Sequence, residues 1–195
     1  FDPGATFRSI ASNDVSLVAV VPVMLSRLLA AAHPLLDVAG LRAVVCSGNV
    51  LSGTLANRWI ERFGPHLYNV YGSTETAIAT VATPQDLVNA PGTVGSAPAG
   101  VTVVILDDQN NPVAPGTIGR VFTSNSMQFD GYTDGTSRTR VGSFMATGDL
   151  GYLDVVGRLF VDGRENDLIV TGGENVFPSQ VEEVLEQHPL VRQAA

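Results

Sequence analysis

The chain has 195 residues, a length that fits one domain or one and a half. Hydrophobic residues make up 45% of it, which is enough for a core. Its net charge of −8 argues against a nucleic-acid-binding protein, because binding a phosphate backbone requires a basic face. No apolar run reaches the length of a transmembrane segment, and a single cysteine, Cys46, permits no disulfide framework. We therefore expect a cytoplasmic protein with no membrane span, in which Cys46 is a small buried hydrophobe.

Residues 1–90 alternate between strand and helix patterns. Their predicted elements are, in chain order, a strand at 15–22, a helix at 23–32, a strand at 41–48, a helix at 52–64 and a strand at 67–73. This order predicts an α/β fold with a parallel sheet covered by helices. Ligands of such sheets gather at the carboxyl ends of the strands, where Ser47–Gly48 and Gly72–Ser73 lie.

Residues 91–163 are rich in Gly, Pro, Val and Asp and show little helical periodicity. Strands are predicted at 101–108, 116–125 and 157–163, which indicates a small antiparallel β-barrel-like subdomain. The stretch 130–143 has no core-forming pattern and is predicted to be a surface loop.

Residues 164–195 are predicted to form a hinge and the start of an α+β C-terminal domain. A short strand and glycine turn are expected at 167–173, and a helix is expected at 178–189. The predicted organisation is therefore a partial α/β subdomain, a β-barrel-like subdomain and the beginning of a third piece.

The segment from Tyr71 to Glu75, YGSTE, places the parts of a nucleotide site on one turn. Gly72 allows a tight turn and close approach of a ligand, and Thr74 can donate a hydrogen bond to a phosphate oxygen. Glu75 is a hard oxygen ligand suited to Mg²⁺, and Tyr71 offers a flat face for a base. The alternative is an ordinary β-turn with a solvated Glu75 and a core Tyr71.

A second polar group follows in TGDLGYLD, residues 147–154, and in the segment that begins at 162. Asp149 is a short carboxylate after a glycine and can accept hydrogen bonds from both hydroxyls of a ribose. Arg164 lies across a predicted hairpin and could reach the same sugar. If each residue is considered alone, Asp149 could be an ordinary turn aspartate and Arg164 an ordinary surface arginine.

Three segments in this order, YGSTE, TGDLGYLD and GRENDLIVTGGENVFPSQVEEVL, resemble the adenylate-forming superfamily and are most similar to its acyl-CoA synthetases. The resemblance covers essentially the whole chain, and LRAVVCSGNVLS resembles the family's adenine-side loop. It implies a ligase that forms acyl-AMP and pyrophosphate from ATP and a carboxylic acid, with a fatty acid favoured. CoA then displaces AMP and gives the thioester.

The resemblance also implies roles for individual residues. Thr74 would bind the α-phosphate and Glu75 the Mg²⁺, and these two are the candidate catalytic residues. Tyr71 would stack on adenine, and Asp149 and Arg164 would bind the ribose. The candidate nucleotide-binding residues are Ser47, Gly48, Asn49, Tyr71, Gly72, Ser73, Asp149 and Arg164. Gly172 and Gly173 would face the pantetheine of CoA, and Asn166 would be the hinge of the C-terminal domain.

The sequence departs from the family in several places. Asn166 replaces the usual Asp or Lys of the hinge, and Asn49 replaces a small residue. The family's phosphate loop and C-terminal lysine are missing, and the sequence contains no lysine at all. Since fixed positive groups supply much of the stabilisation of adenylation, we expect this chain to be a fragment that is inactive in isolation.

Two alternatives stay open. One is an acyl-AMP ligase or an adenylation domain that loads a carrier protein, although the segment GGENVFPSQVEEVL favours the CoA ligases. The other is a non-catalytic paralogue that retains only nucleotide recognition.

Overall fold

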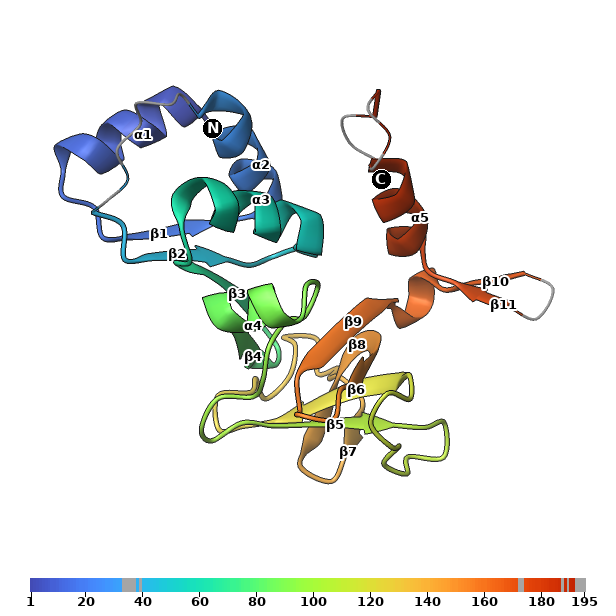
Figure 1. The fold of residues 1–195 in the computed structure, drawn as a ribbon. Coiled ribbons are helices and arrows are strands. Elements are labelled where there is room, and N and C mark those ends of the chain that lie inside the picture. The colour runs from blue at the N-terminus through green and yellow to red at the C-terminus, as the bar shows by residue number, and fades with distance from the viewer. Residues whose placement is uncertain (33–37, 39, 172–173, 187, 189, 192–195) are drawn as a thin grey trace. The chain divides into compact units, whose positions relative to one another are not determined.

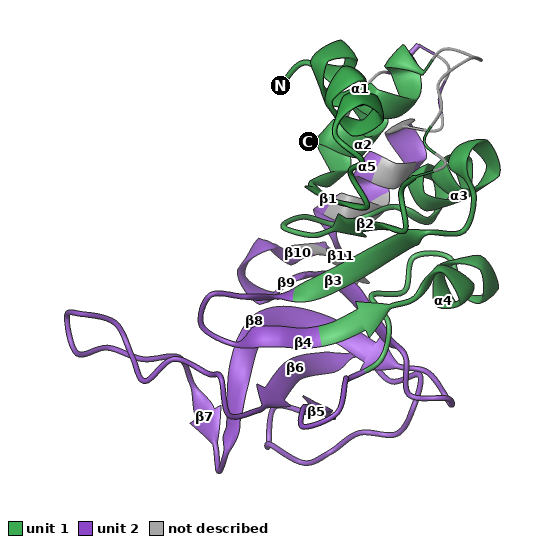
Figure 2. Cartoon of the chain, turned by 90° about the vertical axis from the view of Figure 1, so that its left-hand side faces the viewer, with its two compact units in different colours: residues 1–71, 80–96 green, residues 72–79, 97–195 purple. Residues whose placement is uncertain are grey.

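The computed structural model describes residues 1–32, 38, 40–171, 174–186, 188, 190 and 191. They form two compact units (Figure 2), and buried hydrophobic residues occur in both. The first unit comprises residues 1–71 and 80–96, and the second comprises residues 72–79 and 97–195. Residues 164–195 therefore group with the β-rich segment before them, and a domain boundary at 164 stays a prediction.

The first sheet has the strand order β1-β2-β3-β4, with β1–β2 and β2–β3 parallel (Figure 1). Its strands are β1 (Leu17–Val20), β2 (Ala43–Cys46), β3 (Leu67–Ser73) and β4 (Ala77–Ala82). The helices of this part of the chain are α1 (Pro3–Ser12), α2 (Pro22–Ala31), α3 (Gly53–Phe63) and α4 (Pro84–Asn89). The predicted parallel sheet with helices is confirmed.

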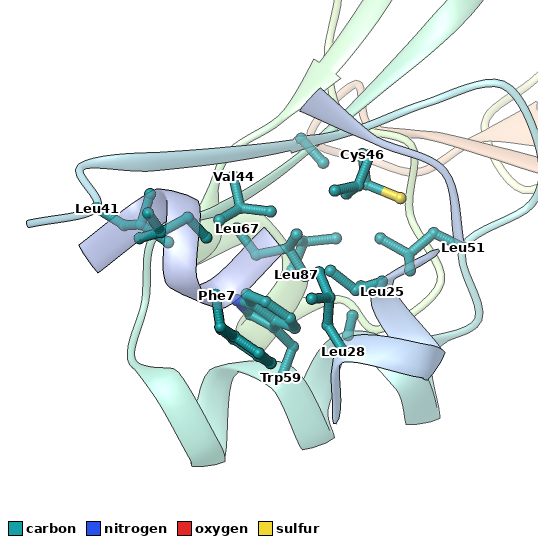
Figure 3. Close-up of a cluster of buried hydrophobic side chains, with 14 residues drawn as sticks. Phe7, Leu25, Leu28, Leu41, Val44, Cys46, Leu51, Trp59, Leu67 and Leu87 are labelled. Atoms are coloured by element: carbon teal, nitrogen blue, oxygen red, sulfur yellow. The ribbon is translucent and has the colours of Figure 1, made fainter. Parts of the chain in front are cut away.

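The core of the first unit lies between this sheet and its helices (Figure 3). Helix α3 directs Trp59 into it and ends at Gly64, whose φ of 98° is one that glycine adopts without strain. Cys46 is fully buried in the same cluster, and burial raises the pKa of its thiol to about 12. Cys46 is therefore a core residue, as predicted, and its burial disfavours the reactive thiolate.

Helix α1 was not predicted from the sequence. It begins where the Asp2 carboxylate accepts a 3.0 Å hydrogen bond from the Ala5 amide, and Pro3 occupies its first turn. Phe7 and Ile10 are its buried residues. A start with Asp followed by Pro is therefore the signal that the sequence offered for this helix.

The second unit contains an antiparallel sheet in the order β5-β6-β8-β7, with β9 paired to β8. Its strands are β5 (Thr102–Leu106), β6 (Gly119–Ser124), β7 (Arg140–Val141), β8 (Phe144–Leu153) and β9 (Leu159–Arg164). This half-barrel confirms the predicted antiparallel subdomain. The structure adds β7, which lies inside the stretch predicted to be a loop, and β8, which carries most of the TGDLGYLD segment.

The chain continues through a short 3-10 helix, η1 (Glu165–Asp167), and the hairpin β10 (Ile169–Thr171) and β11 (Glu174–Val176) into α5 (Pro178–Glu186). The segment is anchored where Phe177, which is buried, packs on Gly163; a Cβ at Gly163 would lie 2.8 Å from its ring. Gly172 and Gly173 lie outside the described residues. Among the described helices, none is long and apolar enough to cross a membrane.

Candidate functional site

The hairpin of residues 72–79 carries most of the YGSTE segment and belongs to the second unit. Its backbone closes tightly, since a Cβ at Gly72 would collide with the carbonyl oxygen of Ala77. The Ser73 hydroxyl accepts a 3.2 Å hydrogen bond from the Thr76 amide and lies 3.0 Å from the Thr76 hydroxyl. Thr74, at the tip, is exposed and available to a ligand.

Four hydrogen bonds between described residues attach this hairpin to the segment that follows β6. The amide of Phe129 donates to the carbonyl oxygen of Glu75 over 2.9 Å, and the side-chain amide of Asn125 donates to the carbonyl oxygen of Thr76 over 2.9 Å. The third and fourth bonds reach the side chain of Glu75 from Tyr132 and Arg138. The backbone of the predicted metal ligand is thus fixed within the second unit.

The carboxylate of Glu75 has two partners from the predicted loop at 130–143. The Tyr132 hydroxyl donates to Oε1 over 2.7 Å, and Nη2 of Arg138 lies 3.1 Å from the same oxygen. The hydrogen bond from Tyr132, together with others that include Arg138, lowers the pKa of Glu75 to about 2. Glu75 is therefore ionised at neutral pH.

Tyr132 and Arg138 were not predicted as site residues, because the stretch that carries them was assigned to the surface. They lie 57 and 63 residues from Glu75 in the sequence, so no local pattern joins them. The available signal was an aromatic residue and two arginines in a stretch without a core-forming pattern.

Glu75 fits Mg²⁺ by the chemistry of its donor group. It is an ionised carboxylate whose side chain is 17% exposed, and the contacts with Tyr132 and Arg138 use Oε1 and not Oε2. Among the described residues there is no group of three or more His, Cys, Asp or Glu side chains that could hold a metal ion. A single carboxylate is the arrangement expected when substrate phosphates and water supply the other Mg²⁺ ligands.

Asp149 and Arg164 lie directly opposite each other on β8 and β9. Nε of Arg164 lies 3.2 Å from Oδ1 of Asp149, and Nη1 donates to the carbonyl oxygen of Thr147 over 3.4 Å. Asp149 is 7% exposed, whereas the Arg164 side chain is 55% exposed. The structure therefore brings these two residues together, as the predicted hairpin required.

Gly148 lies close to both carboxylate–arginine pairs, Asp149–Arg164 and Glu75–Arg138. It has a φ of +82°, which disfavours other residues, and a Cβ there would lie 3.0 Å from Nη1 of Arg138 and 3.8 Å from Nη1 of Arg164. Both guanidinium groups thus approach the same glycine. The second unit therefore holds two carboxylates and two arginines around Gly148, each carboxylate paired with one arginine.

The residues predicted on the adenine side lie in the first unit. Ser47, Gly48 and Asn49 follow β2, where the Ser47 amide donates to the carbonyl oxygen of Val20 over 3.1 Å. The side-chain oxygen of Asn49 accepts a 2.8 Å hydrogen bond from the Val50 amide, so this asparagine closes its own loop. Tyr71 is half-buried near the end of β3.

Comparison with known proteins identifies the protein family to which this chain is similar. The AMP-binding enzyme family matches residues 1–133. Indoleacetate–CoA ligase of Aromatoleum aromaticum is 30% identical over all of this chain and 39% of its own length. The medium/long-chain-fatty-acid–CoA ligase FadD8 of Mycobacterium tuberculosis is 33% identical over 99% of this chain and 35% of its own length.

Solved structures share the fold. The amide bond synthetase McbA from Marinactinospora thermotolerans superposes with a TM-score of 0.91 at 32% identity, over 100% of this chain and 41% of that one. O-succinylbenzoate CoA synthetase (MenE) from Bacillus subtilis, in complex with AMP, gives 0.89 at 28% identity, over 99% and 40%.

The parallel sheet followed by an antiparallel half-barrel is the fold of adenylate-forming enzymes. The chain belongs to the AMP-binding enzyme family, and the two curated relatives described above are named as CoA ligases. It spans between 35% and 41% of the length of the four relatives described above.

Proposed function

We propose that the native protein is an AMP-forming acid–CoA ligase and that this chain supplies its nucleotide-binding surface. The observation that carries the proposal is the Asp149–Arg164 pair together with ionised Glu75 in one unit of a chain from this family. The Asp149–Arg164 pair suits the hydroxyls of a ribose, and Glu75 suits a metal ion that is bound to phosphates.

The proposed reaction has two steps. In the first, a carboxylate oxygen of the acid attacks the α-phosphorus of ATP, a P–O bond forms, and pyrophosphate leaves. In the second, the sulfur of CoA attacks the acyl carbonyl carbon, the thiol proton is lost, and AMP leaves with the electron pair of the C–O bond. Mg²⁺, when bound, would reduce the charge repulsion between the phosphates and the incoming carboxylate.

The residues of this chain would bind and orient the substrates. Asp149 would accept hydrogen bonds from the ribose hydroxyls, and Arg164 would hold Asp149 and reach the same sugar. Thr74, exposed on its turn, would donate to the α-phosphate, while Glu75 would hold Mg²⁺. Gly172 and Gly173 remain the proposed contacts for the pantetheine of CoA.

The adenine would be bound by residues of the first unit. Tyr71 is proposed to stack on the base, with Ser47, Gly48 and Asn49 along its other side. Gly72 and Ser73 would fix the turn from which Tyr71 and Thr74 project, since Gly72 leaves no room for a side chain.

A fatty acid is the proposed acid, and the relatives define the alternatives to be tested. FadD8 is named for medium and long fatty acids, whereas other relatives are named for indoleacetate and 2-succinylbenzoate. McbA is named an amide bond synthetase, so an amine is a second candidate acceptor beside CoA.

The first step is tested by carboxylate-dependent exchange of labelled pyrophosphate into ATP. We expect the native protein to catalyse exchange on the order of 1 per second with at least one acid from a panel of straight-chain fatty acids and arylacetic acids. Omission of the acid should stop exchange. Nucleotide binding without exchange for any acid in the panel would support a non-catalytic paralogue instead.

A further inference from the structure

Arg138 contacts one of the two carboxylates that the proposed function uses and lies close to the residue before the other. Its Nη2 is 3.1 Å from Oε1 of Glu75, while its Nη1 points toward Gly148, the residue before Asp149. This guanidinium therefore contacts the proposed metal ligand, Glu75, and lies close to the residue that precedes the proposed ribose ligand, Asp149. In a nucleotide, the 5′-phosphate joins the ribose to the metal-bound phosphates.

The structure fixes Arg138 from several directions. The next residue, Thr139, accepts a 2.9 Å hydrogen bond from the Ala146 amide of β8, and β7 then pairs with the same strand. Tyr132 shares Oε1 of Glu75 with Arg138. An arginine held in this way loses little conformational freedom when it binds an anion.

Arg138 can bind an anion without giving up Glu75. A guanidinium has five N–H donors, and the contact with Glu75 uses Nη2. Its side chain is 32% exposed, so solvent and ligands reach it. The other guanidinium near Gly148 belongs to Arg164, which binds Asp149 and the carbonyl oxygen of Thr147.

We propose that Arg138 is a phosphate-binding residue of this site and contacts the α-phosphate of the adenine nucleotide. The inference rests on the proposed function, since it takes Glu75 and Asp149 as nucleotide ligands. It assigns a positively charged phosphate contact to a chain that contains no lysine. Charge-assisted, forked hydrogen bonds make arginine well suited to a phosphate.

The test compares the dissociation constants of AMP and adenosine for the native protein and its variants, by equilibrium dialysis with labelled ligands. We expect Arg138→Ala to weaken AMP about 10- to 100-fold and to change adenosine by less than about 2-fold. Adenosine lacks the phosphate, so it separates phosphate binding from damage to the rest of the site. Arg138→Lys, which keeps the charge but not the forked donors, should recover part of the AMP affinity.

Arg140→Ala is the matched control. Arg140 also holds this part of the chain, through Oε1 of Gln128 at 3.2 Å and the carbonyl oxygen of Phe129 at 3.1 Å, but it makes no hydrogen bond to Glu75. The AMP affinity of the Arg140→Ala variant should stay within about 3-fold of that of the wild type. If Arg138→Ala does not fold, Arg138→Gln takes its place in the comparison.

Two results would overturn the inference: equal AMP affinity in Arg138→Ala and wild type, or equal losses of AMP and adenosine. The second result would make Arg138 only the structural partner of Glu75. Failure of the wild-type protein to bind AMP would instead contradict the proposed function, so the two failures can be told apart.

Discussion

Asn166→Pro in the native protein should lower acyl-CoA formation by orders of magnitude and preserve ATP–pyrophosphate exchange. The substitution tests the proposed hinge, because a hinge residue must change its backbone dihedrals between the two half-reactions. Asn166 is the exposed central residue of η1, between β9 and β10. Proline would fix φ near about −65° and remove the amide, which should trap the adenylating state.

Glu165→Pro is the matched control for this substitution. Glu165 is the first residue of η1, where proline is tolerated, and the preceding Arg164 is already extended with φ −77° and ψ 139°. We expect this variant to retain both half-reactions, and Asn166→Ala to be far milder than Asn166→Pro. The hinge assignment fails if Asn166→Pro damages exchange and thioester formation equally.

Asp149→Ala should both raise the KM for ATP and lower kcat. A buried carboxylate that binds two hydroxyls contributes about 2–4 kcal/mol, which corresponds to roughly 30- to 1000-fold in kcat/KM. Asp149 is 7% exposed and held opposite Arg164, so in the alanine variant water cannot easily take the place of its carboxylate as a partner of the ribose hydroxyls. Steady-state kinetics of exchange with varied ATP measures the effect.

Asp154→Ala provides the control for Asp149→Ala. Asp154 also pairs with an arginine, Arg158, at 2.8 Å, at the turn between β8 and β9. It should leave kcat/KM within about 2-fold, since partly exposed pairs contribute little. Replacing ATP with 2′-deoxy-ATP should cost the wild type activity and cost Asp149→Ala almost nothing more. Unchanged ATP kinetics in Asp149→Ala would make Asp149 a turn residue.

Much of the fold was predictable because its signals are local. The apolar face of α3 and the glycine after it predicted the helix that carries Trp59, and the strand predicted at 67–73 is β3 in full. Helix α1 was missed because its start depends on the side chain of Asp2, although Asp followed by Pro is typical of a helix start. The extent of β8 was missed because glycines interrupt its pattern.

The candidate site was predictable only in part. Asp149 and Arg164 could be paired from the sequence because a single hairpin joins them, and hairpin partners follow from local register. Arg138 and Tyr132 could not be paired with Glu75, because their contact depends on how a polar stretch folds back onto a distant hairpin. Long-range contacts of this kind leave no periodic pattern in the chain.

The measurement that tests the central claim most directly is the identity of the products formed from ATP. The native protein is incubated with ATP, Mg²⁺, CoA and each acid of the panel, and the products are quantified by liquid chromatography and mass spectrometry. We expect AMP and one acyl-CoA in equal amounts for the preferred acid. Formation of ADP and phosphate, or intact ATP with every acid while AMP still binds, would contradict the assignment of an AMP-forming ligase.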